Sequence, residues 1–128
     1  MNCLLDTQML IWVANDPGQL PQRARALIAD TGNNLFFSAA SLWEIAIKFS
    51  LNRADFRVDP HILRQGLLDN GYHEISISGV HAVAVKDLPP IHKDPFDRIL
   101  IVQAKLEGIT LLTSDATIAR YESPMLLL

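Results

Sequence analysis

Four acidic residues are spaced along the chain so that one α/β domain could bring them together. Asp6 follows a short apolar run near the start, and Asp115 follows a strand expected over residues 109–113. Glu44 and Asp97 each fall in the first turn of an expected helix. Gathered carboxylates repel one another unless a divalent cation neutralises them, and oxygen-only ligands favour Mg²⁺ or Mn²⁺. A metal held in this way can activate water and stabilise the charge that develops when a phosphodiester is cut.

Helix capping is the alternative explanation for three of these acids. The sequence Ser-Leu-Trp-Glu at 41–44 fits a capping box in which Glu44 closes the helix start. Asp94 and Asp97 flank Pro95 in a pattern typical of a helix N-terminus, and Asp115 could stabilise a helix N-terminus through the dipole. Capping does not account for the acid after the first strand, nor for all four acids falling at one edge.

Short apolar runs alternate with helical periodicity along the chain, which predicts a parallel sheet covered on both faces. Binding sites in this architecture form beyond the carboxyl ends of the strands. The clearest helix begins after Asp94 and ends at Gly108. Strands are expected at 2–5, 35–37, 74–77, 109–113 and 125–128, and helices at 8–14, 22–30, 41–51, 60–68, 79–85, 95–107 and, as a short turn, 115–120.

Length and composition predict a single globular domain over residues 1–128. The 128 residues are 49% hydrophobic and 20% charged, which is enough to form a buried core. The longest stretch without a charged residue has thirteen residues, 31–43, too short to span a bilayer. The first residues lack a basic segment and so do not fit a signal peptide, and the lone Cys3 excludes an internal disulfide. We therefore expect a cytoplasmic protein without a membrane partner.

The net charge of −3 excludes a strongly basic nucleic-acid binder. It does not exclude a metal-dependent nuclease. If four of the 14 acidic residues held a metal, the 11 basic residues would face ten acids, leaving +1 on the rest of the chain.

Four segments of the sequence resemble the PIN-domain ribonucleases, and within them the VapC-type toxins of bacterial toxin–antitoxin pairs. They span nearly the whole chain in the family's order and spacing. The segments are 4–7 with Leu10 and Trp12, 38–48, 92–98 continuing to Gln103 and Ala104, and 111–115.

The resemblance implies a PIN-like three-layer α/β sandwich with a central, mostly parallel sheet of about four to five strands flanked by helices. It also implies Mg²⁺- or Mn²⁺-dependent cleavage of RNA, a cognate antitoxin that blocks the site, and a homodimer. Carried over by position, Asp6, Glu44, Asp97 and Asp115 match the acidic quartet, as catalytic residues and metal ligands. Asp94 matches a supporting acid. Gln8 departs from the family, where His is common, which affects substrate preference rather than activity.

Several neighbours of the acids are weaker candidates. Thr7 and Ser114 could position water or phosphate, although such residues more often close turns. Lys48 is either a surface partner of Glu44 at i,i+4 or a phosphate contact. Arg98 and Lys93 could contact the RNA backbone or remain solvated. The aromatic residues Trp12, Trp43, Phe36, Phe37 and Phe49 are expected to pack in the core, and His92 lies on a loop that could touch RNA.

Other metal-binding α/β folds fit the residues less well. A phosphorylation-receiver domain requires paired acids after the first strand, and a haloacid-dehalogenase-type phosphatase requires Asp-x-Asp, whereas Asp6 is followed by Thr7 and Gln8. Two further alternatives are a non-catalytic PIN-like module that binds RNA or protein, and a purely structural acidic edge without metal. Apolar residues on helices 41–51 and 60–68 exceed what one core requires and indicate a partner surface.

Overall fold

The computed structural model describes residues 1–122 and 124–128. All strand pairs in its five-stranded sheet are parallel, and the strand order is β3-β2-β1-β4-β5. This confirms the α/β fold with a parallel sheet, and each expected strand is found within a few residues of its predicted bounds. The strands are β1 (Asn2–Leu5), β2 (Asn34–Ser38), β3 (His73–Ile75), β4 (Thr110–Thr113) and β5 (Met125–Leu127).

The strand order reverses direction at β1. From β1 the chain adds β2 and β3 on one side, and it then returns to place β4 and β5 on the other. The backbone N–H of Asp6 donates to the carbonyl of Leu112 (3.1 Å), which continues the β1–β4 ladder up to the end of β1. In open parallel sheets the crevice beyond such a reversal is the usual binding position. Asp6 and Asp115 follow the two strands that border it.

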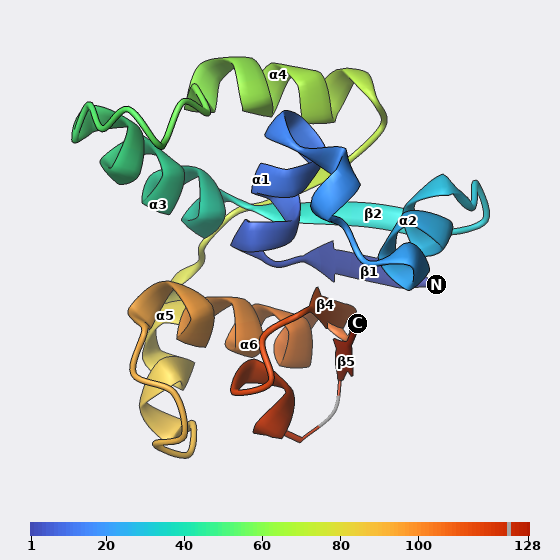
Figure 1. Cartoon of the computed structure of the whole chain (residues 1–128). Helices are drawn as coiled ribbons and strands as arrows, with labels where there is room; N and C mark the ends of the chain where they lie inside the picture. Colours follow the sequence, from blue (N-terminus) through green and yellow to red (C-terminus); the bar gives the residue numbers. More distant parts are fainter. Residues whose placement is uncertain (123) are drawn as a thin grey trace.

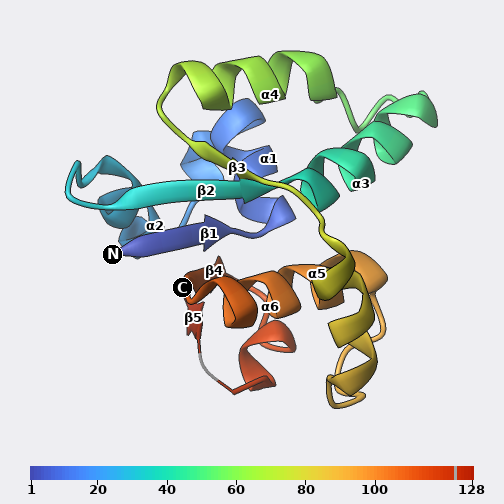
Figure 2. The same cartoon turned by 180° about the vertical axis from the view of Figure 1, so that it is seen from behind.

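Helices cover both faces of the sheet (Figures 1 and 2). Helices α1 to α4 lie on one side, and α5 and α6 lie on the other. In the described part of the chain, no helix is long and apolar enough to cross a membrane. The helices are α1 (Thr7–Asn15), α2 (Gln22–Ala29), α3 (Ala39–Ser50), α4 (Pro60–Asp69), α5 (Gly79–Ala84) and α6 (Pro95–Glu107), with short 3₁₀ turns η1 (Pro17–Gln19), η2 (Val85–Asp87) and η3 (Ile118–Arg120).

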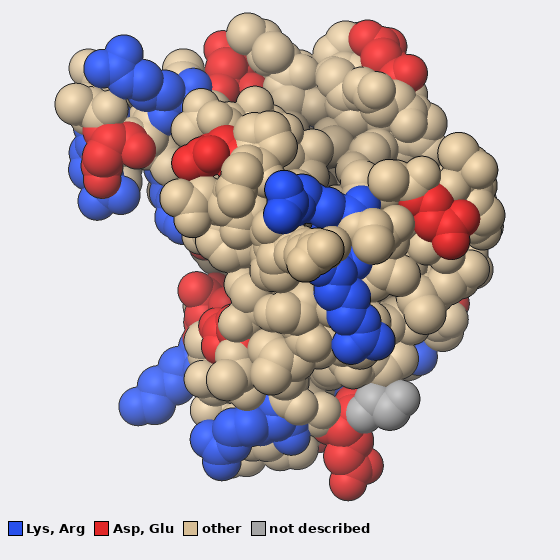
Figure 3. Space-filling view, turned by 45° about the vertical axis from the view of Figure 1, so that its right-hand side comes forward, with Lys and Arg blue, Asp and Glu red and all other residues tan. Residues whose placement is uncertain are grey.

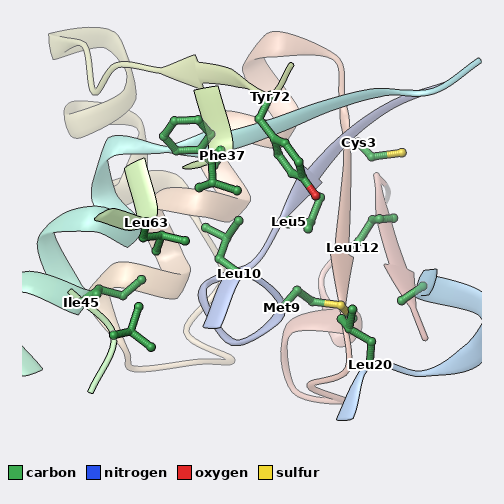
Figure 4. Packing of buried hydrophobic residues seen from close by; sticks show 13 residues of the cluster. Cys3, Leu5, Met9, Leu10, Leu20, Phe37, Ile45, Leu63, Tyr72 and Leu112 are labelled. Atoms are coloured by element: carbon green, nitrogen blue, oxygen red, sulfur yellow. The ribbon is translucent and has the colours of Figure 1, made fainter. Parts of the chain in front are cut away.

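Alternating side chains of the central strands divide the core into two layers. Leu5 and Leu112 point into the cluster beneath α1, α2 and α4, part of which Figure 4 shows, whereas Leu4 and Leu111 point into the cluster beneath α6. This follows from the period of two along a strand. Because both faces are buried, the central strands read as continuous apolar runs.

Two expectations about α3 are wrong. The helix begins at Ala39 and is capped by Ser38, whose hydroxyl accepts a hydrogen bond from the Ala40 N–H (3.0 Å). The predicted capping box at 41–44 is therefore absent, because its serine lies inside the helix. Trp43 and Phe49, expected in the core, are exposed, since the buried residues of the helix are Ala40, Ser41 and Ile45. Phe37 is buried, and Trp12 and Phe36 are partly buried against the two clusters.

A buried polar network ties β2 to α6. The Ser38 hydroxyl donates to Gln103 Oε1 (2.6 Å), and Gln103 Nε2 donates to the carbonyl of Ser76 (3.3 Å). Nδ1 of His81 lies 3.4 Å from the same Nε2, and Nε2 of His81 lies 2.8 Å from Glu107 Oε1. Ser38 and Gln103 are fully buried. A satisfied network of this kind fixes one relative position of the elements it joins.

We predict that Gln103→Leu lowers the free energy of unfolding by about 1–3 kcal/mol, because it leaves buried polar groups unpaired. Urea titration of both proteins measures the difference. The matched control is Gln65→Leu, which removes an exposed bond to Asp69 and should cost less than about 0.5 kcal/mol. Equal losses in the two variants would show that the network does not stabilise the fold.

Candidate metal centre

The four predicted acids line one cavity at the carboxyl edge of the sheet. Its volume is about 260 Å³. The structure thus brings together residues that are far apart in sequence, as predicted, while their roles stay predictions. A larger cavity of about 650 Å³ between α1 and α4 contains none of these acids. The lining of the smaller cavity, called here the acid cavity, is Asp6, Thr7, Gln8, Ile11, Glu44, Lys48, Asp94, Asp97, Ser114, Asp115 and Ile118.

Asp6 is the most buried acid of the cavity, with 3% of its surface exposed. It also caps α1, because its Oδ1 accepts a hydrogen bond from the Met9 N–H (2.9 Å). The sequence analysis did not foresee this cap, because it began the helix one residue later. Burial raises the pKa of Asp6 to about 6, and the charges of Asp115 and Glu44 add to the rise, against hydrogen bonds from Thr113 and Met9.

Asp97 faces the cavity from the first turn of α6, as predicted. Asp94 caps this helix through bonds from the N–H groups of Phe96 (2.8 Å) and Asp97 (3.2 Å). Burial raises the pKa of Asp97 to about 6, and the neighbouring charge of Asp94 raises it further, while His92 acts in the opposite direction.

Asp115 closes the turn after β4. Its N–H donates to Thr113 Oγ1 (2.9 Å), and its Oδ1 accepts from the Thr117 N–H (2.8 Å). The other carboxylate oxygen, Oδ2, lies 3.8 Å from His92 Nε2. Asp115 therefore takes the cavity position and closes a turn, but it does not cap a helix, because η3 begins at Ile118 with Thr117 as its N-cap.

Glu44 lies in the second turn of α3, not in the first. It forms an i,i+4 ion pair with Lys48, whose Nζ lies 3.1 Å from Glu44 Oε2. Because helix capping uses Ser38, the Glu44 carboxylate is free to face the cavity. Beneath it the Thr7 hydroxyl donates to the Ser41 hydroxyl (2.9 Å), a buried bond that joins α1 to α3.

His92, predicted only as a loop residue that could touch RNA, contacts the acids of the site directly, which the sequence did not reveal. Its Nε2 lies 2.8 Å from Asp97 Oδ2, and His92, Asp97 and Asp115 offer ligand atoms that all lie within 4.8 Å of one another. The backbone N–H of His92 donates to the Tyr121 hydroxyl (2.8 Å), which fixes the loop that carries this histidine. The available signal was its position five residues before Asp97, at the entrance to the longest helix.

Arg98 is held by hydrogen bonds within the chain, and its contact with the RNA backbone stays a prediction. One terminal nitrogen donates to the carbonyls of Pro89 and His92 (both 3.1 Å) and to the Tyr121 hydroxyl (3.2 Å). The other terminal nitrogen donates to the carbonyl of Val85 (2.9 Å) and, more weakly, to the carbonyl of Leu88 (3.4 Å). Arg98 therefore holds the 85–92 loop, including the backbone of His92, against α6. Lys93, directly after this loop, is exposed. Ser114 lines the acid cavity, as expected.

Negative charge in the acid cavity is far from balanced within the chain. Five acids line it with a single lysine, and that lysine is already paired with Glu44. In Figure 3 acidic side chains are visible in a hollow on one side of the molecule, with Lys and Arg side chains above and below it. Such an arrangement of carboxylates around a hollow can bind a divalent cation.

We predict that Asp6→Asn stabilises the metal-free protein at neutral pH. The raised pKa means that Asp6 favours the folded state below about pH 4 and loses this contribution as pH rises through about 6. Asparagine keeps the cap to Met9 without the charge, so the gain should be near zero at pH 4 and up to about 3 kcal/mol at pH 7. Urea titrations in EDTA at both pH values measure it.

The matched control is Asp59→Asn, which changes the N-cap of α4 outside the acid cavity and should give no gain that grows with pH. A gain at Asp6 that is the same at pH 4 and pH 7 would contradict the account of its burial.

Comparisons with known proteins agree with the fold. The structure is similar to VapBC2 from Rickettsia felis, solved bound to a DNA fragment from its promoter (TM-score 0.68, 18% identity, covering 100% of this chain and 98% of that one). It is also similar to VapBC-1 from nontypeable Haemophilus influenzae (TM-score 0.59, 15% identity, covering 99% of this chain and 98% of that one). A third similar structure is FitAcB from Neisseria gonorrhoeae (TM-score 0.55, 16% identity, covering 91% of this chain and 89% of that one). No curated protein matches the sequence significantly. The model of the PIN domain family matches residues 3–123, nearly the whole chain, and the protein therefore belongs to the PIN-domain family.

Proposed function

We propose that this protein is a metal-dependent endoribonuclease that acts as the toxin of a toxin–antitoxin pair. PIN domains are typically nucleases, and the similar solved structures include VapBC assemblies. The observation that carries the proposal is the acid cavity at the strand-order reversal, where four carboxylates converge and burial raises the pKa of two of them to about 6.

The donor set fits Mg²⁺ or Mn²⁺. Carboxylate oxygens dominate the cavity, and the only imidazole beside them in the described residues belongs to His92; hard oxygen ligands suit both ions. We infer that Asp6 and Asp97 hold the cation directly, with Glu44 and Asp115 holding the same ion, a second ion or bound water. When bound, the cation would lower the pKa of a water molecule and neutralise charge on the cleaved phosphate.

The surrounding side chains orient these ligands. His92 fixes one oxygen of Asp97 at 2.8 Å, which leaves the other free to face the cavity. Asp94 supports Asp97 by capping its helix. Lys48 is placed to contact a substrate phosphate when its partner Glu44 turns to the cation. Exposed Lys93 can follow the RNA backbone, whose binding depends on such charges.

Partner binding is part of the proposal. We infer a cognate antitoxin that covers the acid cavity and a homodimer of the chain, acting in the cytoplasm. Exposed apolar residues on α3, just after it and on α4 support a partner surface, among them Ile47, Leu51 and Ile62. The alternative function, a non-catalytic PIN-like module that binds RNA or protein, is less well supported because all four acids are present and converge.

Incubation of cellular RNA with the purified chain tests the activity. With Mg²⁺ or Mn²⁺ we expect discrete products that disappear with EDTA and fall at least about 100-fold with Asp97→Asn or Asp6→Asn, because each removes a charge that holds the cation. The matched control Asp87→Asn changes an acid outside the cavity, paired only with Lys86, and should cleave normally. Absence of metal-dependent cleavage by the folded, antitoxin-free chain would favour the binding module.

The role of His92 is tested by His92→Leu and His92→Gln. Loss of the bond to Asp97 should reduce cleavage about 10- to 100-fold, the usual effect of removing a partner that orients a metal ligand. Glutamine can still donate to the carboxylate and should recover part of the rate. The control His61→Gln alters an exposed histidine on α4. Unchanged cleavage by His92→Leu would remove His92 from the site.

A further inference from the structure

Two aromatic residues adjoin two of the cavity acids, one on α3 and one on α6. Trp43 directly precedes Glu44, and Phe96 directly precedes Asp97. Their ring centroids lie 5.1 Å apart with the planes at 79°, an edge-to-face contact. Neither ring lines the acid cavity, but their contact joins α3 to α6 at the residues that directly precede Glu44 and Asp97.

Trp43 is held in place by this contact but is not buried by it. The residue is 60% exposed, whereas the other tryptophan, Trp12, packs partly buried against the core. Edge-to-face packing on Phe96 restrains the indole. The indole therefore presents an ordered and exposed aromatic surface on the helix that carries Glu44.

We propose that Trp43 is a platform on which one unpaired base of the RNA substrate stacks, next to the phosphodiester in the acid cavity. The inference rests on the proposed function. Stacking on aromatic side chains is a common way to hold single-stranded nucleic acid, because every base has a π-face. Bases within a duplex are already stacked on one another, so the platform requires an unpaired nucleotide beside the cleaved bond.

A second copy of the chain is the competing occupant of this surface. Ile47 and Leu51 follow Trp43 at i+4 and i+8 and are also exposed, so the three form an apolar stripe along α3. Only its indole end, however, precedes Glu44 and contacts α6 beside Asp97. The aliphatic residues of the stripe, Ile47 and Leu51, lie one and two helical turns farther along the chain. This placement of the aromatic group favours a base at Trp43.

The test uses the full chain carrying Asp97→Asn, which prevents cleavage, titrated with an unstructured oligoribonucleotide of about eight nucleotides. We expect binding to quench tryptophan fluorescence. Trp43→Leu should weaken binding about tenfold or more, because it removes the stacking surface while staying apolar. Trp43→Phe should abolish most of the quenching but retain most of the affinity. Val83→Ala, at an exposed apolar residue on α5, is the control and should bind normally.

Equal RNA affinity in the parent and Trp43→Leu chains would overturn the proposal. So would light scattering that shows a dimer converted to a monomer by Trp43→Leu, since the surface would then belong to a second copy. The two proposals can fail separately. A chain that cleaves RNA with the same kcat/KM with or without Trp43→Leu disproves only the stacking, whereas a chain that binds this RNA but never cleaves it disproves only the nuclease.

Discussion

The concentration of negative charge in a partly buried cavity is the constraint on which the whole fold depends. The strand order places the ends of β1 and β4 side by side, so Asp6 and Asp115 meet wherever the sheet forms correctly. Burial and mutual repulsion oppose ionisation there, which raises the pKa of Asp6 and of Asp97 to about 6. The helix N-termini beside both acids and the lone Lys48 offset part of this cost. Binding of a cation, as proposed above, would relieve the remaining repulsion, in keeping with the common trade of stability for activity.

Helix α6 connects this constraint to the rest of the molecule through three polar side chains. Asp97 at its start enters the acid cavity, Arg98 holds the 85–92 loop and thereby His92, and Gln103 binds Ser38 at the end of β2. Since Ser38 also caps α3, the helix that carries Glu44 is fixed to the helix that carries Asp97. The spacing of the carboxylates is therefore set by buried hydrogen bonds rather than by the carboxylates themselves, which would otherwise move apart.

Sequence periodicity predicted the fold well because apolar runs and helix caps are local signals. The helix from Asp94 to Gly108 was placed correctly, since its N-cap, proline and left-handed glycine (φ 67°) all act within a few residues. The start of α3 was misplaced because Ser38 and Ser41 are equally good caps, and the choice depends on Gln103, which is 65 residues away from Ser38. The place of His92 beside Asp97 was missed for a similar reason, because a loop held by tertiary bonds leaves no periodic signal.

Equilibrium binding of Mn²⁺, followed by electron paramagnetic resonance, tests most directly whether the four carboxylates hold a divalent cation. The free ion gives a signal that is lost on binding. We predict that the wild-type chain at pH 7 binds Mn²⁺ at sub-millimolar concentration and that Mg²⁺ competes for the site. Asp6→Asn and Asp97→Asn should lose most of this binding, while Asp87→Asn keeps it. A wild-type chain that binds no Mn²⁺ at millimolar concentration, or variants that bind it as well as the wild type, would contradict the account and leave the four acids without a role in metal binding.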